Sequence, residues 1–423
     1  MKRPLGLILA ALLAAACSKG PVDESAADPD ALAREYLLLE LSMGLHDAAH
    51  VDAYFGPEEI RSKAADAALS LAAIEARSAR LAAQLRAGTQ SVRTSKLIER
   101  LQALDTRIAL NEGKTLSFDE ESRRLFGATA PDYDAAHFHA ILGDLDALLG
   151  GEGNLSARVN GFRDRFIIPP NRVAAVMDAA IAECRRRTLL FISLPENESF
   201  ELEFVTGKPW SGYNWYQGDA QSLIQINTDL PIYIDRAVDL GCHEGYPGHH
   251  TFNALLEKNL VQDRGWIEYS LYPLFSPQSL IAEGSGNYGI ELAFRGEERV
   301  QFERDVLFPL AGLDPAGAAD YYALLELLER LDYAENEAAR DYLDGTIDRE
   351  QAVQWLVDYS LVSRERAEQR VDFFDTYRSY IINYNLGQDL VRDYVERDTD
   401  DRAARWHKFE QLLSSPMSAA DLQ

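Results

Sequence analysis

The sequence predicts a mainly helical protein with two lobes, a small antiparallel β-sheet and one cleft. Residues 30–194 are rich in Ala, Leu, Arg and Glu with a helical period of apolar residues, and this period resumes after Pro231. The stretch 196–231 instead alternates apolar and polar residues between Gly and Pro turns, as strands do. Residues 31–423 are too many for one ordinary hydrophobic core. We therefore expect an N-terminal helical lobe over residues 31–195 and a second lobe over residues 196–423 that carries the chemistry.

The first thirty residues have the pattern of a lipoprotein signal. A basic start precedes an apolar run, Leu5 to Leu13, that is too short to span a bilayer, and Ala14-Ala15-Ala16-Cys17 follows as a lipobox. We expect residues 1–16 to be a signal peptide, Cys17 to be lipidated and residues 17–30 to form a flexible tether. Ser18 indicates an outer-membrane protein that faces the periplasm. An ordinary cleaved signal with an incidental cysteine is the alternative.

The charge of the chain limits its partners. The formal net charge is −26 and no basic cluster in the sequence offsets it. Nucleic acid and anionic lipid surfaces are therefore poor partners, and the only expected contact with a membrane is through the N-terminal lipid.

Two further cysteines follow Cys17, and the sequence leaves their state open. Cys184 and Cys242 could pair in an oxidising compartment, but only geometry decides whether they do. Cys242 adjoins a histidine, and a small buried residue is favoured there over a nucleophile or ligand.

The N-terminal helical stretch contains histidines that carry no clear chemistry. Signals such as Pro57 followed by two glutamates mark helix starts. His46 and His50 are four residues apart and could share a metal, but no acid or base pattern accompanies them. We expect both to be structural or exposed.

Three short segments predict the sheet, and they directly precede the most informative run of the chain. Alternating or aromatic patterns cover Ser199 to Val205, Tyr213 to Gln217 and Ser222 to Asn227. Beside a cleft, an edge strand can pair with an extended peptide. A ribbon that only covers the core is the alternative.

The run His243-Glu244-Gly245-Tyr246-Pro247-Gly248-His249-His250 holds three of the eight histidines and a carboxylate. Neutral imidazoles and carboxylates are ligands for Zn²⁺, and a catalytic zinc site has three protein ligands and one open position. In the His-Glu-x-x-His motif of zincins, the Glu next to the first His is the general base. The run therefore predicts a metal site, with an exposed His-rich turn as the alternative.

The spacing of these histidines requires a bend in the chain. On a straight helix His249 would lie about 240° around and about 9 Å along the axis from His243. Two imidazoles cannot share one ion across that distance with bonds of about 2.1 Å. Pro247 lacks the N–H that a helix needs, and Gly248 can adopt a φ that other residues avoid. We therefore expect the helix to break here and His249 to fold back toward His243.

A later segment supplies a third ligand. Glu283 follows His249 by thirty-four residues in Ile281-Ala282-Glu283-Gly284-Ser285-Gly286-Asn287-Tyr288, where small residues would let another backbone come close. A solvated surface glutamate is the alternative.

Three motifs together resemble the bacterial family catalogued as domain of unknown function 885. They are His-Glu-Gly-x-Pro-Gly-His-His from His243, Glu-Gly-x-x-x-Tyr from Glu283 to Tyr288, and Tyr384-Asn385-Leu386-Gly387. The tail from Trp406 to Pro416 also looks like the family's ending, so the resemblance runs from Ser199 to the C-terminus. Many members are lipid-anchored, and they are generally predicted to be zinc-dependent peptidases with a helical, neurolysin-like zincin fold. Ser285-Gly286 stand where the family usually has Trp-Ala, which leaves the substrate open.

The residues and the resemblance together predict a lipid-anchored, zinc-dependent hydrolase acting on a peptide or small amide. His243, His249 and Glu283 are expected to hold one Zn²⁺, which activates water. Glu244 is the expected general base, and Tyr384 the expected donor to the oxyanion. His250 and Tyr288 are candidates for an alternative ligand or for a group that supports a ligand from behind. The alternative function is a lipoprotein that binds a metal or a partner without catalysis.

Overall fold

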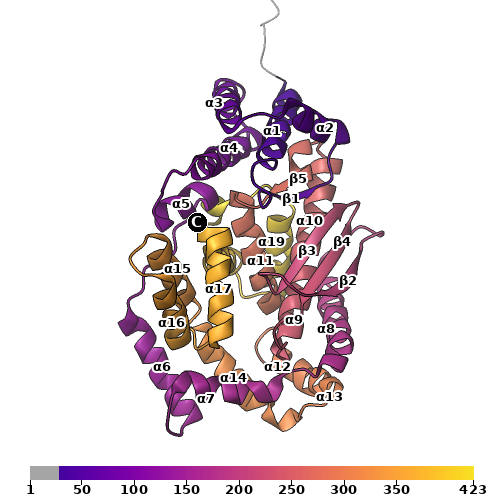
Figure 1. Ribbon diagram of the computed structural model, residues 1–423. Coiled ribbons are helices and arrows are strands. Elements are labelled where there is room, and N and C mark those ends of the chain that lie inside the picture. The colour runs from indigo at the N-terminus through magenta and orange to yellow at the C-terminus, as the bar shows by residue number, and fades with distance from the viewer. Residues whose placement is uncertain (1–27) are drawn as a thin grey trace, which may run out of the picture.

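The computed structural model describes residues 28–423, so the predicted signal peptide, Cys17 and most of the tether lie outside the described residues. The described chain is mainly helical with two small sheets, which confirms the predicted fold class (Figure 1). Up to the larger sheet the helices are α1 (Pro29–Met43), α2 (Glu58–Ala67), α3 (Leu71–Ala87), α4 (Val92–Asn111), α5 (Phe118–Phe126), α6 (Ala135–Leu149), α7 (Leu155–Arg163) and α8 (Val173–Thr188).

Twelve further α-helices follow the larger sheet in the described residues. They are α9 (Asp235–Leu240), α10 (His249–Leu256), α11 (Pro277–Ala293), α12 (Glu297–Phe302), α13 (Phe308–Ala311), α14 (Ala318–Glu329), α15 (Tyr333–Leu343), α16 (Arg349–Tyr359), α17 (Arg364–Tyr377), α18 (Ile382–Glu396), α19 (Arg402–Leu413) and α20 (Ala419–Leu422). Within residues 28–423, no helix is both long enough and apolar enough to cross a bilayer.

Helices α1 to α4 gather at one end of the molecule, the upper end in Figure 1, and share an apolar cluster that Leu271 joins from outside them. Ser70 and Ser91 cap the starts of α3 and α4 by accepting backbone N–H bonds, which explains where these helices begin. A buried bidentate ion pair between Arg93 of α4 and Glu268 fastens this end to the rest of the chain, with N–O distances of 2.7 and 2.8 Å.

The larger sheet has the strand order β2-β4-β3, with β2 at Ser199–Val205, β3 at Gly212–Gly218 and β4 at Gln221–Asn227. Strands β3 and β4 form an antiparallel hairpin, whose turn residues Asp219 and Ala220 both have positive φ, as primed turns require. The expectation of a wholly antiparallel sheet is wrong for β2, which runs parallel to β4. The reason is that β4 inserts between β2 and β3, so β2 and β3 remain opposite in direction but are not neighbours.

A second, two-stranded sheet joins distant parts of the sequence. Strand β1 (Val51–Tyr54) pairs antiparallel with β5 (Leu271–Pro273). This pairing carries a segment from the N-terminal helices into the centre of the molecule, next to β3.

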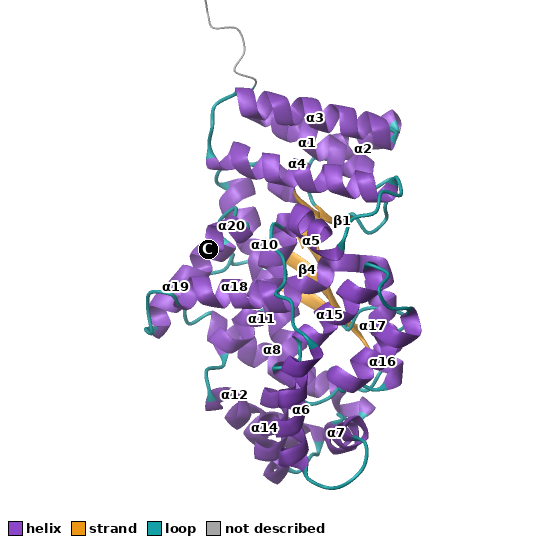
Figure 2. Ribbon diagram, turned by 90° about the vertical axis from the view of Figure 1, so that its left-hand side faces the viewer, coloured by secondary structure: helices purple, strands orange, loops and turns teal. Residues whose placement is uncertain are grey.

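The centre of the molecule is the packed pair α11 and α18, with α15 to α17 drawn on one side and the three-stranded sheet on the other (Figure 1). Turned by 90°, the strands show only as short orange segments among the helices (Figure 2). The main hydrophobic core runs through this region and includes Phe126 of α5, Val176 of α8, Ile281 of α11 and Val391 of α18. A cavity of about 550 Å³ opens between α17 and β3, with α11 and α18 lining it.

Candidate metal centre

The run that carries the three histidines does not form one helix. Helix α9 continues as a π-helix over Gly241–Gly245, Tyr246 is extended with φ −123° and ψ 120°, and α10 begins at His249. The predicted break is therefore present. It lets His243 and His249 approach from two consecutive helical segments, which a straight rod would keep apart.

Gly248 permits this break for a different reason from the one expected. Its φ is −78°, so the expected φ that other residues avoid is not present. A Cβ on Gly248 would instead lie 1.8 Å from the carbonyl oxygen of His243. Its N–H donates to the carbonyl of Cys242 at 3.0 Å. The folded-back chain thus packs backbone against backbone, and only glycine leaves room for that contact.

The structure brings His243, His249 and Glu283 into one cluster. Nε2 of His243 lies 3.0 Å from Oε2 of Glu283, and Nε2 of His249 lies 3.6 Å from the same oxygen. One ligand atom from each of the three residues lies within 4.8 Å of the others. A tetrahedral zinc with bonds of about 2.1 Å separates its ligand atoms by about 3.4 Å. The distances to Glu283 fit that geometry.

Side chains behind the cluster fix the orientation of its members. Nδ1 of His243 donates to Oδ1 of Asn287 at 2.8 Å, which leaves the lone pair of Nε2 free to face Glu283. The hydroxyl of Tyr380 donates to Oε1 of Glu283 at 2.7 Å, which leaves Oε2 toward the histidines. The amide of Asn287 also donates to the backbone carbonyl of Tyr384, so one residue links the first histidine to α18.

Two glycines of α11 let its neighbours reach the cluster. A Cβ on Gly286 would lie 2.8 Å from Nδ1 of His243, and a Cβ on Gly284 would lie 2.3 Å from the backbone of Gly387 on α18. The expectation that small residues after Glu283 permit close approach is met by both contacts. Gly286 therefore lies directly against the ring of a candidate ligand, where a side chain would collide with it.

Glu244 lies beside the cluster and has the environment expected of a general base. Its side chain is buried, and Oε2 has no hydrogen-bond partner among the described residues. Burial raises the pKa of its carboxyl, against the opposing effect of His243 and His249. Nδ1 of His249 is likewise buried without a partner in residues 28–423. Three convergent ligand atoms and an unsatisfied carboxylate next to them fit a catalytic zinc site.

The charges of the metal-free cluster favour a protonated His249 beside an ionised Glu283. Burial alone would lower the pKa of His249, but Glu283 raises it to about 9. Burial alone would raise the pKa of Glu283, but the two histidines hold it well below its usual range. A cation of either kind, a proton or a metal ion, therefore stabilises this group of side chains.

His250 and Tyr288 lie outside the cluster, which corrects the expectation that either supports it. Both ring nitrogens of the buried His250 are engaged, with Ser222 Oγ at 2.8 Å and Glu198 Oε2 at 3.2 Å. The hydroxyl of Tyr288 donates to Glu396 at 3.0 Å, and its ring packs against Phe409. The cause is helical spacing, because α10 turns His250 about 100° away from His249, and α11 turns Tyr288 away from Glu283.

Tyr384 faces the cavity near the cluster. Its ring centroid lies 6.4 Å from that of His243, and the residue lines the cavity together with Glu244 and Glu283. Burial raises the pKa of its hydroxyl well above the usual value, so the phenol keeps its proton and can donate it in a hydrogen bond.

Sequence reasoning missed other residues of the site. Asn287 follows Glu283 by four residues and Tyr380 precedes Tyr384 by four, so helical spacing from the identified residues could have found both. Asp52 of β1 and Tyr213 of β3 also line the cavity, where the tyrosine hydroxyl donates to the aspartate. No local signal marks Asp52, because a strand pairing across the fold brings it here.

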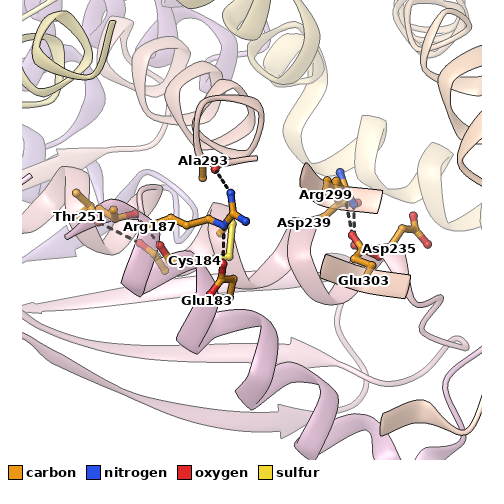
Figure 3. The surroundings of a disulfide bond; sticks show 12 residues. Glu183, Cys184, Arg187, Asp235, Asp239, Thr251, Ala293, Arg299 and Glu303 are labelled. Carbon is orange, nitrogen blue, oxygen red and sulfur yellow. Dashed lines mark hydrogen bonds and ion pairs between the residues drawn. A yellow bond between two sulfur atoms is a disulfide. The ribbon is translucent and has the colours of Figure 1, made fainter. Parts of the chain in front are cut away.

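A disulfide joins Cys184 of α8 to Cys242, the residue before His243, with Cα atoms 5.5 Å apart. In its surroundings, shown in Figure 3, Arg187 reaches the carbonyl of Ala293 at the end of α11 at 2.9 Å and pairs with Glu183. The disulfide thus ties the segment that carries the first candidate ligand to the helix behind it.

No family model and no curated protein matches the chain. Among solved structures, a predicted lipoprotein from Colwellia psychrerythraea is 16% identical with a TM-score of 0.52, over 86% of this chain and 71% of that one. Metallocarboxypeptidase 1 of Trypanosoma cruzi is 12% identical with a TM-score of 0.46, over 93% of this chain and 94% of that one. An M32 carboxypeptidase from Deinococcus radiodurans is 12% identical with a TM-score of 0.39, over 91% and 90%. The Colwellia protein shares the fold of this chain.

Proposed function

We propose that the protein is a zinc-dependent peptidase, held at the cell envelope by a lipid on Cys17. The observation that carries this proposal is the convergence of His243, His249 and Glu283 beside the unpartnered carboxylate of Glu244. Structural zinc sites have four protein ligands and favour cysteine, whereas catalytic sites keep one position open. In the described residues, the group of candidate ligands has three members and no cysteine.

The side chains of the cluster have separate tasks in this proposal. His243, His249 and Glu283 would hold the zinc, with Asn287 and Tyr380 keeping the first and third of them in orientation. Bound zinc supplies Lewis-acid chemistry, which acidifies water and polarises the carbonyl of the bond to be cleaved.

Proton transfer and charge stabilisation then fall to groups of the chain itself. Glu244 takes the proton of the attacking water and passes it to the leaving amine, and its raised pKa suits a group that must both accept and release a proton. The hydroxyl of Tyr384 donates a hydrogen bond where negative charge develops on the carbonyl oxygen. These two groups line the same cavity as the candidate ligands.

The sheet supplies a place for an extended substrate. Strand β3 is an edge of the three-stranded sheet, and Gly212, Tyr213 and Asn214 on it line the cavity. Extended peptides bind to such edges through main-chain hydrogen bonds. Gly212 lies so close to Glu244 that a Cβ there would be 2.8 Å from its Oε1, so a peptide along β3 would pass the base.

The test combines metal analysis with cleavage of a peptide library. We expect the purified protein to contain one zinc per chain and to cleave peptides in a way that a chelator abolishes and added zinc restores. Mass spectrometry of the products identifies the bond that is cleaved. A zinc-loaded protein that cleaves no peptide or small amide would support the alternative of a metal-binding lipoprotein, and a protein that binds no zinc would contradict the peptidase proposal.

A further inference from the structure

Three arginines from separate parts of the chain line the cavity that holds the candidate metal centre. They are Arg163 at the end of α7, Arg236 on α9 and Arg366 on α17. A basic group of this kind is unexpected in a protein with a net charge of −26, and it is absent from any one stretch of the sequence. The fold alone brings these side chains together.

The other arginines of the cavity are neutralised by carboxylates, but these three are short of partners. Arg299 pairs with Asp239 at 2.7 Å, and Arg370 pairs with Glu335 at 3.2 Å. Within the described residues, by contrast, the guanidinium of the half-buried Arg366 makes no hydrogen bond and no ion pair, although each guanidinium offers five donors.

Arg163 and Arg236 also lack a full set of hydrogen-bond and ion-pair partners in residues 28–423. Arg163 forms no ion pair with the described residues, its Nε is buried without an acceptor, and its guanidinium lies over the ring of Tyr233 at 4.4 Å. Arg236 binds Asp239 through one nitrogen at 3.0 Å, but that carboxylate is shared with Arg299. Burial opposes the charged form of Arg163, but the charge of Asp235 compensates and raises its pKa, so Arg366 is the member of the group that has no carboxylate partner among the described residues.

The pKa of Arg366 agrees with its lack of a carboxylate partner in the described chain. Burial, followed by the charges of Arg236, Arg370 and Arg163, lowers the pKa of Arg366 to about 10. Burial, followed by neighbouring acids, raises the pKa values of Glu329 and Asp332, two other carboxylates of the cavity. An anion that enters the cavity would relieve the mutual repulsion of the arginines and accept their free N–H groups.

The position of the arginines relates this anion to the candidate chemistry. Arg236 lies on the helix that leads directly into the segment of His243, and its charge acts on the carboxyl of Glu244. We propose that Arg163, Arg236 and Arg366 form a subsite for a substrate carboxylate, which places the scissile bond of a peptide near Glu244. This inference rests on the proposed peptidase function and specifies the substrates that the site prefers.

A carboxylate can come from the C-terminus of a peptide or from an acidic side chain, and paired peptides distinguish these sources. One pair has the same sequence with a free or an amidated C-terminus, and the other has an internal Asp or Asn with both C-termini amidated. For the pair that contains the recognised carboxylate, we expect kcat/KM of the wild type to favour the acid. In Arg366→Gln this preference should fall roughly 10- to 100-fold, the effect of losing a hydrogen bond between charged groups.

Two further variants separate charge from general damage. Arg366→Lys keeps the positive charge and should retain part of the preference. Arg364→Gln, two residues earlier on α17, removes an exposed arginine that pairs with Glu350 and should leave both the preference and the activity unchanged. A preference for the free C-terminus would indicate a carboxypeptidase, and a preference for the internal acid would indicate recognition of an acidic side chain; both support the subsite.

A binding measurement keeps the subsite testable if the peptidase proposal fails. Calorimetry of the metal-free protein would compare an N-acetyl dipeptide with its C-terminal amide, and an N-acetyl-aspartyl amide with its asparaginyl counterpart. Tighter binding of an acid by the wild type but not by Arg366→Gln supports the subsite even when no peptide is cleaved. If neither acid is favoured by the wild type, in cleavage or in binding, or if Arg366→Gln retains the full preference, the proposal is overturned.

Discussion

Glu244 has the environment of a general base, since it is buried, adjoins a candidate ligand and leaves one carboxylate oxygen without a partner in the described chain. Glu244→Gln preserves the shape of the side chain but cannot accept a proton. We expect the variant to retain its zinc while kcat falls by about 10²–10⁴. Metal analysis and steady-state kinetics on one cleaved peptide check this, and near-normal turnover in the zinc-loaded variant would remove Glu244 from the mechanism.

Tyr380 and Tyr384 form a matched pair, because their hydroxyls serve different atoms. Both tyrosines line the cavity, but it is the hydroxyl of Tyr380 that donates to Glu283. We expect Tyr380→Phe to weaken zinc binding about 10–100-fold, as loss of a group that orients a ligand does. Tyr384→Phe should instead lower kcat about 10²–10³ with zinc content unchanged. Zinc titration and kinetics at saturating zinc separate the two, and a loss of stability with normal turnover in Tyr384→Phe would make that residue structural.

The metal-free charge state of His249 predicts how zinc binding depends on pH. Glu283 raises the pKa of His249 to about 9, so the imidazole carries a proton at pH 7, and zinc requires the neutral ring. Binding at pH 7 should therefore release about one proton from His249, and apparent affinity should fall about tenfold per pH unit below 9. Calorimetry in buffers of different ionisation enthalpy measures the release. Zinc binding without proton release, and with an affinity independent of pH, would contradict this charge state.

Among the elements, the break between α9 and α10 depends on Gly248. A Cβ there would lie 1.8 Å from the carbonyl oxygen of His243, and backbone atoms have little freedom to move away. We expect Gly248→Ala to lower the free energy of unfolding by about 2 kcal/mol or more, because overpacking is costly, and to lose zinc.

Gly143→Ala is the matched control for Gly248→Ala, because it makes the same change at a glycine that has free space around it. Gly143 lies in α6 with open space around its missing Cβ. The change should stabilise the protein by about 0.5–1 kcal/mol, because alanine favours a helix. Urea denaturation measures both variants, and equal stability of the two would show that the close contact is not needed.

The sequence was informative where the chemistry is local. The missing N–H of Pro247 predicted the break, and the imidazole and carboxylate ligand types predicted which residues converge. The state of Cys184 and Cys242 stayed open because pairing depends on Cα positions set by packing. The parallel pairing of β2 and the arrival of Asp52 depend on contacts between distant segments, so no periodicity in the chain reveals them.

Considered as a whole, the molecule closes its cavity with material from both ends of the chain. Strand β1 brings Asp52 from the N-terminal helices, and α17 and α18 bring Arg366 and Tyr384 from near the C-terminus. Lys96 of α4 also donates to Ser418 at 2.7 Å and pairs with Asp421, so the two ends contact each other directly. The geometry of the site therefore depends on the folding of nearly the whole described chain.

Because of the disulfide, the free energy of unfolding is expected to depend on whether the protein is in an oxidising compartment. The disulfide closes a loop between residues 58 positions apart, and a cross-link of that length stabilises a protein by about 2–4 kcal/mol, because it restricts the unfolded chain. We expect the free energy of unfolding of the double variant Cys184→Ser/Cys242→Ser to be lower by that amount. Urea denaturation measures this difference. The double variant should also bind zinc more weakly, since Cys242 adjoins His243.

Wild-type protein without residues 1–27, which keeps the start of α1 and the ion pair of Asp30 with Arg93, offers the matching comparison between compartments. Made in a reducing cytosol, it should behave like the double variant, and exported to an oxidising periplasm it should regain full stability, because disulfides persist only in oxidising compartments. Thiol titration of both preparations verifies the redox state. If oxidised wild type and the double variant unfolded at the same urea concentration and bound zinc equally, the disulfide would contribute nothing to the site, and the proposed dependence of the site on an oxidising compartment would fail.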